Sequence, residues 1–275
     1  MAAGGSFPMP NPVLEKAQER ASSEMTGMSF LDHLEELRRR IIFSFLSIVG
    51  GFCVCWWYHE QIFALMQKPI VQALANHGLD QKLVYLNPTD AFNMYLKVSF
   101  LAGIFVASPF VLYQVWAFIS PGLYRHERRY VLPFMFSTVG LFLAGGYFGY
   151  RMVFPAALDF LIGWSSQFKP MVTIGEYTDL FLTIIAGLGI VFEMPILVFF
   201  LALMGVVSAG WMWRNLRYSI LVIFIIAAVI TPTTDIMNMC IFAAPMIVLY
   251  LVSIAIAWFV HPTQRRKRAE KAGGE

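Results

Sequence analysis

The sequence predicts an all-α integral membrane protein with six transmembrane helices and both termini on the cytoplasmic side. The first observation is the composition, because 58% of the 275 residues are hydrophobic and only 13% are charged. A soluble domain is about half apolar and about a quarter charged. The other observations are a set of long apolar segments and an alternation of basic and weakly charged connections between them. The apolar surplus indicates that a bilayer is the solvent.

Six apolar segments account for the predicted spans. They are Ile41–Tyr58, Ala91–Ile119, Tyr130–Phe154, Thr178–Val207, Leu216–Ile230 and Ile236–Phe259. A helix needs about 20 residues to cross roughly 30 Å of hydrocarbon, and most of the segments are long enough. The fifth has only about 15 residues, or roughly 22 Å. We therefore expect the bilayer to thin around it.

Positive charges in the connections predict the orientation of these spans. The basic tails and connections contain Arg38, Arg39, Arg40, Arg125, Arg128, Arg129, Arg214, Arg217, Arg265, Arg266, Lys267 and Arg268. The alternate connections contain few cations: Lys68, Lys82 and Lys169. Because the bias changes at every crossing, the chain is predicted to have its N- and C-termini inside the cell.

The chain divides into three predicted parts. Residues 1–28 read as a flexible cytoplasmic tail, residues 29–260 as the six-span membrane domain, and residues 261–275 as a basic cytoplasmic tail. On the outer side, the long connections Glu60–Thr89 and Leu158–Tyr177 contain amphipathic stretches, and we expect them to form a cap of short interfacial helices. The lack of a visible internal repeat argues against inverted-repeat transporters.

The stretch "SFLDHLEELRRRII" places charged side chains on one face of a helix. His33, Glu36 and Arg40 have the spacing i, i+3 and i+7, which brings them together on that face. One interpretation is an amphipathic interfacial helix with solvated charges. The other is a binding surface at the cytoplasmic end of the first span.

The stretch "ISPGLYRHERRYVLPF" contains Glu127 among three arginines, after the helix-breaking Pro121 and Gly122. It is either a basic loop in which the acid moderates charge repulsion, or a second place for binding. "HERRY" lacks the second histidine of the zinc-protease motif, so no metal site is predicted there. The sequence also lacks a phosphate-binding loop and a nucleophilic serine motif. We expect neither an enzyme nor a cofactor.

Glu193 lies in the middle of the apolar stretch "AGLGIVFEMPILVFFLAL". An ionised acid there costs several kcal/mol, so we expect it to be protonated, paired or hydrated. It could be a structural hydrogen-bond donor, a proton relay, or a polar point that attracts water and a partner helix. Gly189, one turn earlier, is expected to leave room on that face.

Four motifs together resemble those of the TatC family, the multispanning receptor subunits of twin-arginine protein translocases. "FLDHLEELRRR" is similar to the family's N-terminal signature, and "PFVLYQVWAFISPGLYRHERR" to its first cytoplasmic loop. "GIVFEMP" is similar to its fourth-span glutamate motif, and "TPTTD" to its turn between spans five and six. They occur in the family's order.

The resemblance implies a glove-shaped receptor in the bacterial cytoplasmic (inner) membrane. Its implied partners are the twin-arginine signal peptides of folded cargo proteins, single-span proteins of the TatA and TatB type, membrane lipid and further copies of itself. Nucleic acid is not among them. The implied activity is export of folded cargo driven by the proton-motive force.

The resemblance also assigns residues. The implied signal-peptide-binding residues are Glu36, Glu127, His33, Arg38, Arg40 and Phe118. The implied partner contacts at the turn between spans five and six are Thr231, Asp235 and Met239. Many relatives have a polar residue at the position of Met239, so the polar contact here is either carried by Thr231 or weaker.

Two rival functions follow from Glu193. A transporter of small solutes would use a midplane site beside Glu193 and Pro195, but Glu193 is isolated there. A proton-conducting subunit would use Glu193 as a relay, but further acids or histidines are missing from the interiors of the spans. A receptor for peptides instead predicts acidic groups at the cytoplasmic ends, where Glu36 and Glu127 are found.

Overall fold

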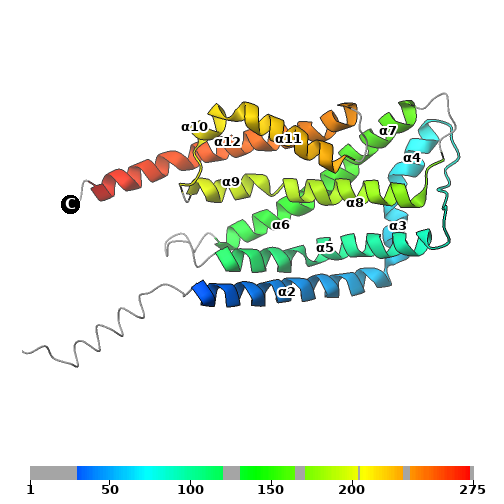
Figure 1. Ribbon diagram of the computed structural model, residues 1–275, viewed down its shortest axis with the longest axis horizontal. Coiled ribbons are helices and arrows are strands. Elements are labelled where there is room, and N and C mark those ends of the chain that lie inside the picture. Colours follow the sequence, from blue (N-terminus) through cyan, green and yellow to red (C-terminus); the bar gives the residue numbers. More distant parts are fainter. Residues whose placement is uncertain (1–29, 120–130, 165–170, 204, 232–235, 273–275) are drawn as a thin grey trace, which may run out of the picture.

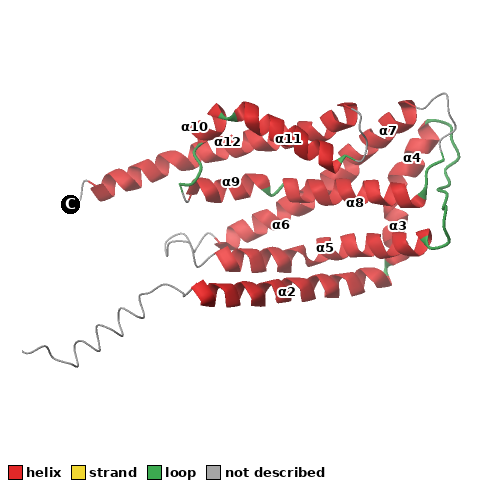
Figure 2. Cartoon of the chain, in the orientation of Figure 1, coloured by secondary structure: helices red, strands yellow, loops and turns green. Residues whose placement is uncertain are grey.

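Helices make up the regular secondary structure throughout the described part of the chain. The computed structural model describes residues 30–119, 131–164, 171–203, 205–231 and 236–272. Figures 1 and 2 show long helices lying side by side, with shorter helices at one end. Among these residues the β-pairing is limited to an isolated parallel bridge between Val84 and Thr173. The predicted all-α class is confirmed.

The helix bounds follow the chain order. They are α2 (Phe30–Trp57), α3 (His59–Met66), α4 (Lys68–Asn76), α5 (Asp90–Ile119), α6 (Val131–Phe148), the π-helical turn η3 (Gly149–Val153), α7 (Phe154–Trp164), α8 (Ile174–Val191), α9 (Met194–Leu203), α10 (Ala209–Arg214), α11 (Leu216–Ile230) and α12 (Ile236–Ala272). The turn η3 joins α6 directly to α7, so residues 131–164 are helical throughout.

Several helical segments in the described ranges are long and apolar enough to cross a membrane. They are His33–Trp57, Asp90–Phe118, Ile174–Ala202 and Ile236–Trp258. The segment Leu216–Val229 is apolar but shorter, as the sequence predicts for the fifth span. Helix α6 and η3 occupy the third predicted segment. The protein thus has the apolar helices of a membrane protein, while the number of crossings stays a prediction.

The first and last helices are longer than the predicted spans. Helix α2 begins at Phe30, so the charged stretch containing Glu36 is continuous with the first apolar segment. Helix α12 continues to Ala272. Because the charged stretch and the apolar segment belong to one helix, α2 holds the charged side chains in a fixed position relative to the bundle.

The fourth predicted segment is broken. Helix α8 ends at Val191 and α9 begins at Met194. Pro195 has no backbone N–H to donate to the carbonyl four residues earlier, which interrupts the helical ladder. At the break the N–H of Glu193 donates to the carbonyl oxygen of Ile190, 3.1 Å away, so the turn is locally tighter.

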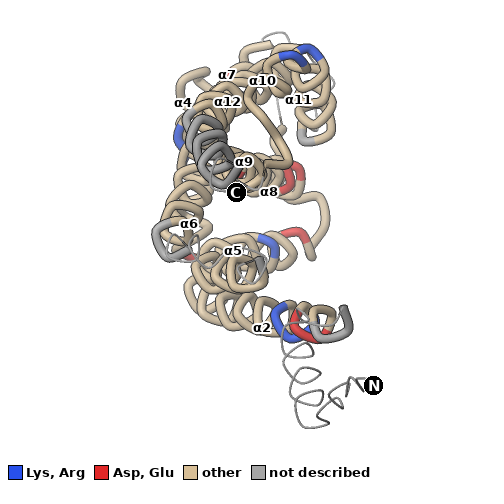
Figure 3. The backbone as a smooth tube through the Cα atoms, turned by 90° about the vertical axis from the view of Figure 1, so that its left-hand side faces the viewer, with Lys and Arg blue, Asp and Glu red and all other residues tan. Residues whose placement is uncertain are grey.

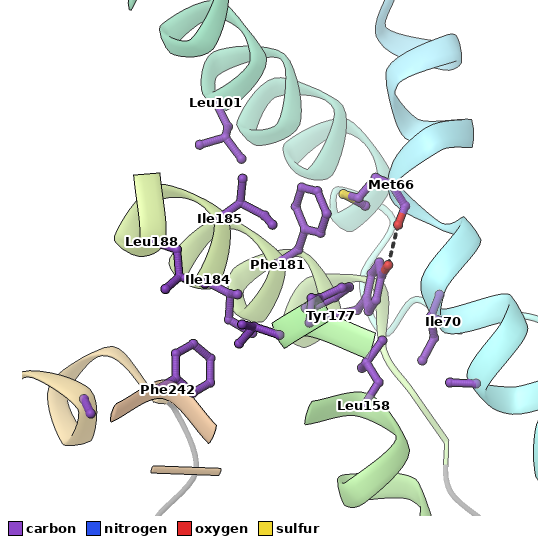
Figure 4. Close-up of a cluster of buried hydrophobic side chains, with 14 of the residues drawn as sticks. Met66, Ile70, Leu101, Leu158, Tyr177, Phe181, Ile184, Ile185, Leu188 and Phe242 are labelled. Carbon is purple, nitrogen blue, oxygen red and sulfur yellow. Dashed lines mark hydrogen bonds between the residues drawn. The ribbon is translucent and has the colours of Figure 1, made fainter. Parts of the chain in front are cut away.

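The predicted short helices of the outer connection are present as α3 and α4. Their attachment is largely through a buried cluster shown in Figure 4. There the Tyr177 hydroxyl, from α8, donates to the backbone carbonyl of Met66, the last residue of α3. Carbonyls at a helix end have no intrahelical partner, so this bond satisfies one of them inside the core. Phe154, from α7, packs against the same tyrosine.

The two ends of the bundle carry different connections. In Figure 1 the start of α2 and the connection from α9 to α10 lie at the left-hand end, whereas α3 and α4 lie at the right-hand end. Figure 3 looks onto the left-hand end and shows basic residues on α2 and near α10 and α11. Since Arg38, Arg39 and Arg40 lie near the start of α2 and Arg214 ends the short helix α10, these arginines lie toward the same end of the molecule.

Candidate functional site

A cluster of polar and aromatic side chains joins the start of α2 to the end of α5. The imidazole ring of His33 stacks on the ring of Phe118, with centroids 4.4 Å apart and planes 16° apart. One turn further along α2, Glu36 and Arg40 form an ion pair. Arg40 also reaches across to α5, where its Nη1 donates to Oε1 of Gln114 at 3.1 Å. The structure thus brings together four of the predicted signal-peptide-binding residues: His33, Glu36, Arg40 and Phe118.

The two carboxylate oxygens of Glu36 have different surroundings. Oε1 accepts hydrogen bonds from Nε of Arg40 at 2.9 Å and from its Nη2 at 2.5 Å. Oε2 is buried and has no hydrogen-bond partner among the described residues. An ionised carboxylate has about four acceptor positions, and a buried acceptor without a donor is costly. A further donor would satisfy Oε2 while Arg40 stays on Oε1, provided that the side chains covering Oε2 move aside.

The neighbouring arginines point elsewhere. Arg38 and Arg39 are exposed, and the guanidinium of Arg39 lies 5.6 Å from the centre of the Phe43 ring. Arg38 is therefore not among the clustered side chains. Glu127, the second predicted acid, falls in residues 120–130, outside the described residues.

Two glycines set the spacing between α2 and α5. A Cβ atom on Gly51 would lie 2.5 Å from the carbonyl oxygen of Gly103, and one on Gly103 would lie 2.6 Å from the amide nitrogen of Phe52. The two backbones therefore touch, a packing that small residues permit in membrane helices. Because α2 and α5 are held this closely, Arg40 can reach Gln114 and His33 can reach Phe118.

Glu193 lies at the break between α8 and α9, away from this cluster. Its Oε1 is buried and lacks a hydrogen-bond partner in the described chain. The expected room at Gly189 is not there: a Cβ on this glycine would lie 3.1 Å from a ring carbon of Phe142 and 3.4 Å from one of Phe105. That expectation was wrong because rings from α5 and α6 fill the space that the missing side chain leaves.

The histidines, cysteines and acids of the described chain do not gather into a group of three that could hold a metal ion. Lys97 of α5 forms an ion pair with Asp179 of α8, with Nζ and Oδ1 2.6 Å apart. Arg151, in η3, is exposed.

Comparison with known proteins decides the family. A family described as "Sec-independent protein translocase protein (TatC)" matches residues 32–245. The chain belongs to the TatC family. It is 74% identical over 264 residues to the Sec-independent protein translocase protein TatC of Koribacter versatilis (strain Ellin345). The matched region covers 95% of this chain and 97% of that protein.

More distant TatC proteins show the same match. The TatC protein of Carboxydothermus hydrogenoformans is 37% identical, over 86% of this chain and 96% of its own. A crystal structure described as the twin arginine translocase receptor TatC superposes with a TM-score of 0.74 at 32% identity, covering 82% of this chain and 97% of that chain. Membership of a protein-translocase family, with its helical fold, is therefore shown across most of the chain.

The predicted partner contacts Thr231, Asp235 and Met239 are only partly described. Thr231 is buried, and its hydroxyl donates to the carbonyl of Ala227 at 2.8 Å. Met239 is partly buried against the main core, and Asp235 lies outside the described residues. The hydroxyl proton of Thr231 is thus used within its own helix, which leaves its oxygen as an acceptor.

Gln114 is the site residue that sequence reasoning missed. It lies in the TatC-like stretch "PFVLYQVWAF", one helical turn before Phe118. The sequence signal was the side-chain amide of Gln114 within an otherwise apolar helix, since buried polar side chains need hydrogen-bond partners. The spacing from Phe118 could have placed it on the same face of α5.

Proposed function

We propose that this chain is the receptor subunit of a twin-arginine translocase, binding the signal peptides of folded cargo at the cytoplasmic face. The observation that carries the proposal is the carboxylate of Glu36, of which the described residues engage only one oxygen. One carboxylate oxygen can accept two hydrogen bonds from a planar guanidinium, as Oε1 does from Arg40, and the ammonium of lysine does not present such a fixed pair of donors. This chemistry explains why a receptor would require arginines in its ligand.

A pair of arginines suggests a pair of acids. We assign Glu36 and Glu127 to this role, with His33, Arg40 and Phe118 shaping the site around Glu36, and Arg38 at its edge. Glu127 follows α5 in the chain, and α5 carries the residues that contact Arg40 and His33. Phe118 places the end of α5 beside His33, one turn from Glu36, and Glu127 follows nine residues later in the chain, which supports a shared site.

The topology belongs to the same proposal. Six spans, with both termini in the cytoplasm, would place the start of α2 and the start of α11 at the cytoplasmic face of the bacterial inner membrane. The start of α2 and helix α10, which precedes α11, lie at the same end of the bundle in Figure 1, and the arginines of both support this orientation. A glove-shaped bundle is supported by Figure 3, in which α2 and α11 lie at opposite edges.

Transport requires partners that this chain does not contain. We propose assembly with single-span proteins of the TatA and TatB type, and with further copies of this chain, for export driven by the proton-motive force. Thr231, Asp235 and Met239 are the proposed contacts at the outer turn, and Glu193 the proposed contact within the membrane. The receptor works by binding, without a catalytic residue or a cofactor of its own.

A crosslinking experiment tests the receptor function. A synthetic signal peptide with a photoreactive residue beside its two arginines is irradiated with membranes containing the full chain, and the crosslinked residues are mapped. We expect crosslinks to residues 30–40 and 120–130, and their loss when both arginines are replaced by lysine. Equal crosslinking by the twin-lysine peptide would refute the proposal.

A further inference from the structure

A groove of about 380 Å³ lies between α9, α11 and α12, far along the chain from the Glu36 cluster. Apolar side chains form most of its wall, among them Val198, Val222, Ile226 and Met246. The volume is in the range of pockets that hold small molecules, roughly 300–1,000 Å³. Its occupant must match a largely apolar surface.

Most of the polar side chains that line the groove already have partners within the protein. The hydroxyl of Ser219 donates to the Tyr250 oxygen at 2.7 Å, and the hydroxyl of Tyr250 donates to the carbonyl of Met212 at 3.3 Å. The Ser253 hydroxyl donates to the carbonyl of Leu249, and the Asn215 amide donates to the carbonyl of Trp211. A polar solute would find few free donors here, so the groove does not resemble the site of a solute transporter.

A hydrocarbon chain is the occupant that this lining favours. Apolar cavities do not hold water, because a bound water molecule needs two to four polar partners. An empty groove would also lose the dispersion contacts of its wall atoms. After its first turn, from Ile220 to Ile230, helix α11 is apolar throughout. In a bilayer the groove therefore faces lipid tails, which can fill it.

The end of the groove nearest the start of α11 carries positive charge. The guanidinium of Arg217 lies 4.7 Å from the ring centre of Tyr218, a lining residue, and its Nη2 donates to the Tyr218 hydroxyl at 3.0 Å. Arg214 lies three residues earlier and is also exposed. Trp211, another lining residue, is exposed there as well, and tryptophan favours the headgroup region of a membrane.

We propose that this groove binds an anionic phospholipid, with one acyl chain between α9, α11 and α12 and its phosphate at Arg217 and Arg214. The charge distinguishes an anionic lipid from a zwitterionic one, because clustered basic residues at a membrane surface attract anionic headgroups. The lipid would come from the cytoplasmic leaflet if the proposed orientation holds. A lipid seated there would also cover a flank of α11, the short helix.

Native mass spectrometry of the full chain tests this site without any signal peptide. The protein is released from nanodiscs containing equal amounts of phosphatidylglycerol and phosphatidylcholine, and the retained lipids are counted. We expect phosphatidylglycerol to be retained. Val222→Trp, at a half-exposed lining position, should fill the groove and abolish retention, whereas Val229→Trp, on the same helix but outside the lining, should not.

The charge is tested by a second pair of variants. Arg217→Gln should lower the preference for phosphatidylglycerol about fivefold, the scale of one basic residue at an anionic surface. Arg151→Gln removes an exposed arginine from η3 and should leave the preference unchanged. Unchanged retention in Val222→Trp, or an unchanged preference in Arg217→Gln, would overturn the proposal. Neither result would bear on signal-peptide binding at Glu36.

Discussion

Arg40 binds one carboxylate oxygen of Glu36 and leaves the other buried without a partner in the described chain. Gln114 holds the same guanidinium from α5, so the position of Arg40 is fixed from two helices. The side chains of Glu36 and Arg40 are only 19% and 24% exposed. A ligand that brings a second guanidinium to Glu36 would complete a site that the protein leaves half occupied.

The first prediction concerns this carboxylate. Glu36→Gln should weaken the binding of a twin-arginine peptide about tenfold to a hundredfold, since a charged hydrogen-bonded contact contributes roughly 1.5–3 kcal/mol. Glu127→Gln should have a similar effect. Glu35→Gln is the control, because Glu35 is exposed beside Glu36 on α2. Peptide titration by fluorescence anisotropy measures the affinities, and parent affinity in the Glu36–Glu127 double variant would contradict the assignment.

The second prediction concerns the contact between α2 and α5. Gly103→Ala should separate the two helices, because the new methyl group would meet the backbone of Phe52. We expect a loss of roughly 1–3 kcal/mol in stability, together with weaker peptide binding. Gly50→Ala is the control, since nothing lies within 4 Å of a Cβ there. Thermal unfolding followed by tryptophan fluorescence distinguishes them, and equal stability in both variants would show that the backbones do not need to touch.

The third prediction concerns Glu193. Ile190 and Leu197, on either side of it, are exposed, so the acid borders an open strip of α8 and α9 where a partner span could lie. A neutral acid in contact with such a span can be imitated by glutamine. Glu193→Gln should therefore retain much of the transport, while Glu193→Leu should lose transport and keep peptide binding. A proton relay would fail equally in both variants, and transport assays with a folded cargo separate the two accounts.

The fourth prediction concerns the ion pair of Lys97 and Asp179. Their side chains are 45% and 61% exposed, so we expect a coupling of only about 0.2–1 kcal/mol, and less at high salt. A double-mutant cycle with Lys97→Met and Asp179→Asn measures the coupling through thermal unfolding. A coupling above about 2 kcal/mol would mean that the pair is shielded from solvent in the assembled protein.

The fifth prediction concerns topology. Alkaline phosphatase fused after Lys82 or Lys169 should be active, because those connections are predicted to lie outside the cytoplasm. Fusions after Arg128 or Arg266 should be inactive. An active enzyme at Arg266 would place the C-terminus outside and would reverse the proposed orientation of the receptor site.

The sequence by itself determined the membrane class, the approximate helices and the shared face of His33, Glu36 and Arg40. These features depend on composition and on the helical repeat, which are local and can be read within a few turns. The motif order also led directly to the TatC family. Pro195 indicates an interrupted helix in the fourth segment, but the end of α8 at Val191 and the start of α9 at Met194 appeared only in the structure.

Only the tertiary structure decided which helices meet. The bond from Arg40 to Gln114 joins residues 74 positions apart, and the pair of Lys97 and Asp179 spans 82 positions. Packing also filled the space at Gly189 with aromatic rings from two other helices. Such contacts depend on how whole helix surfaces fit together, whereas the periodicity of one helix shows only which of its own residues share a face.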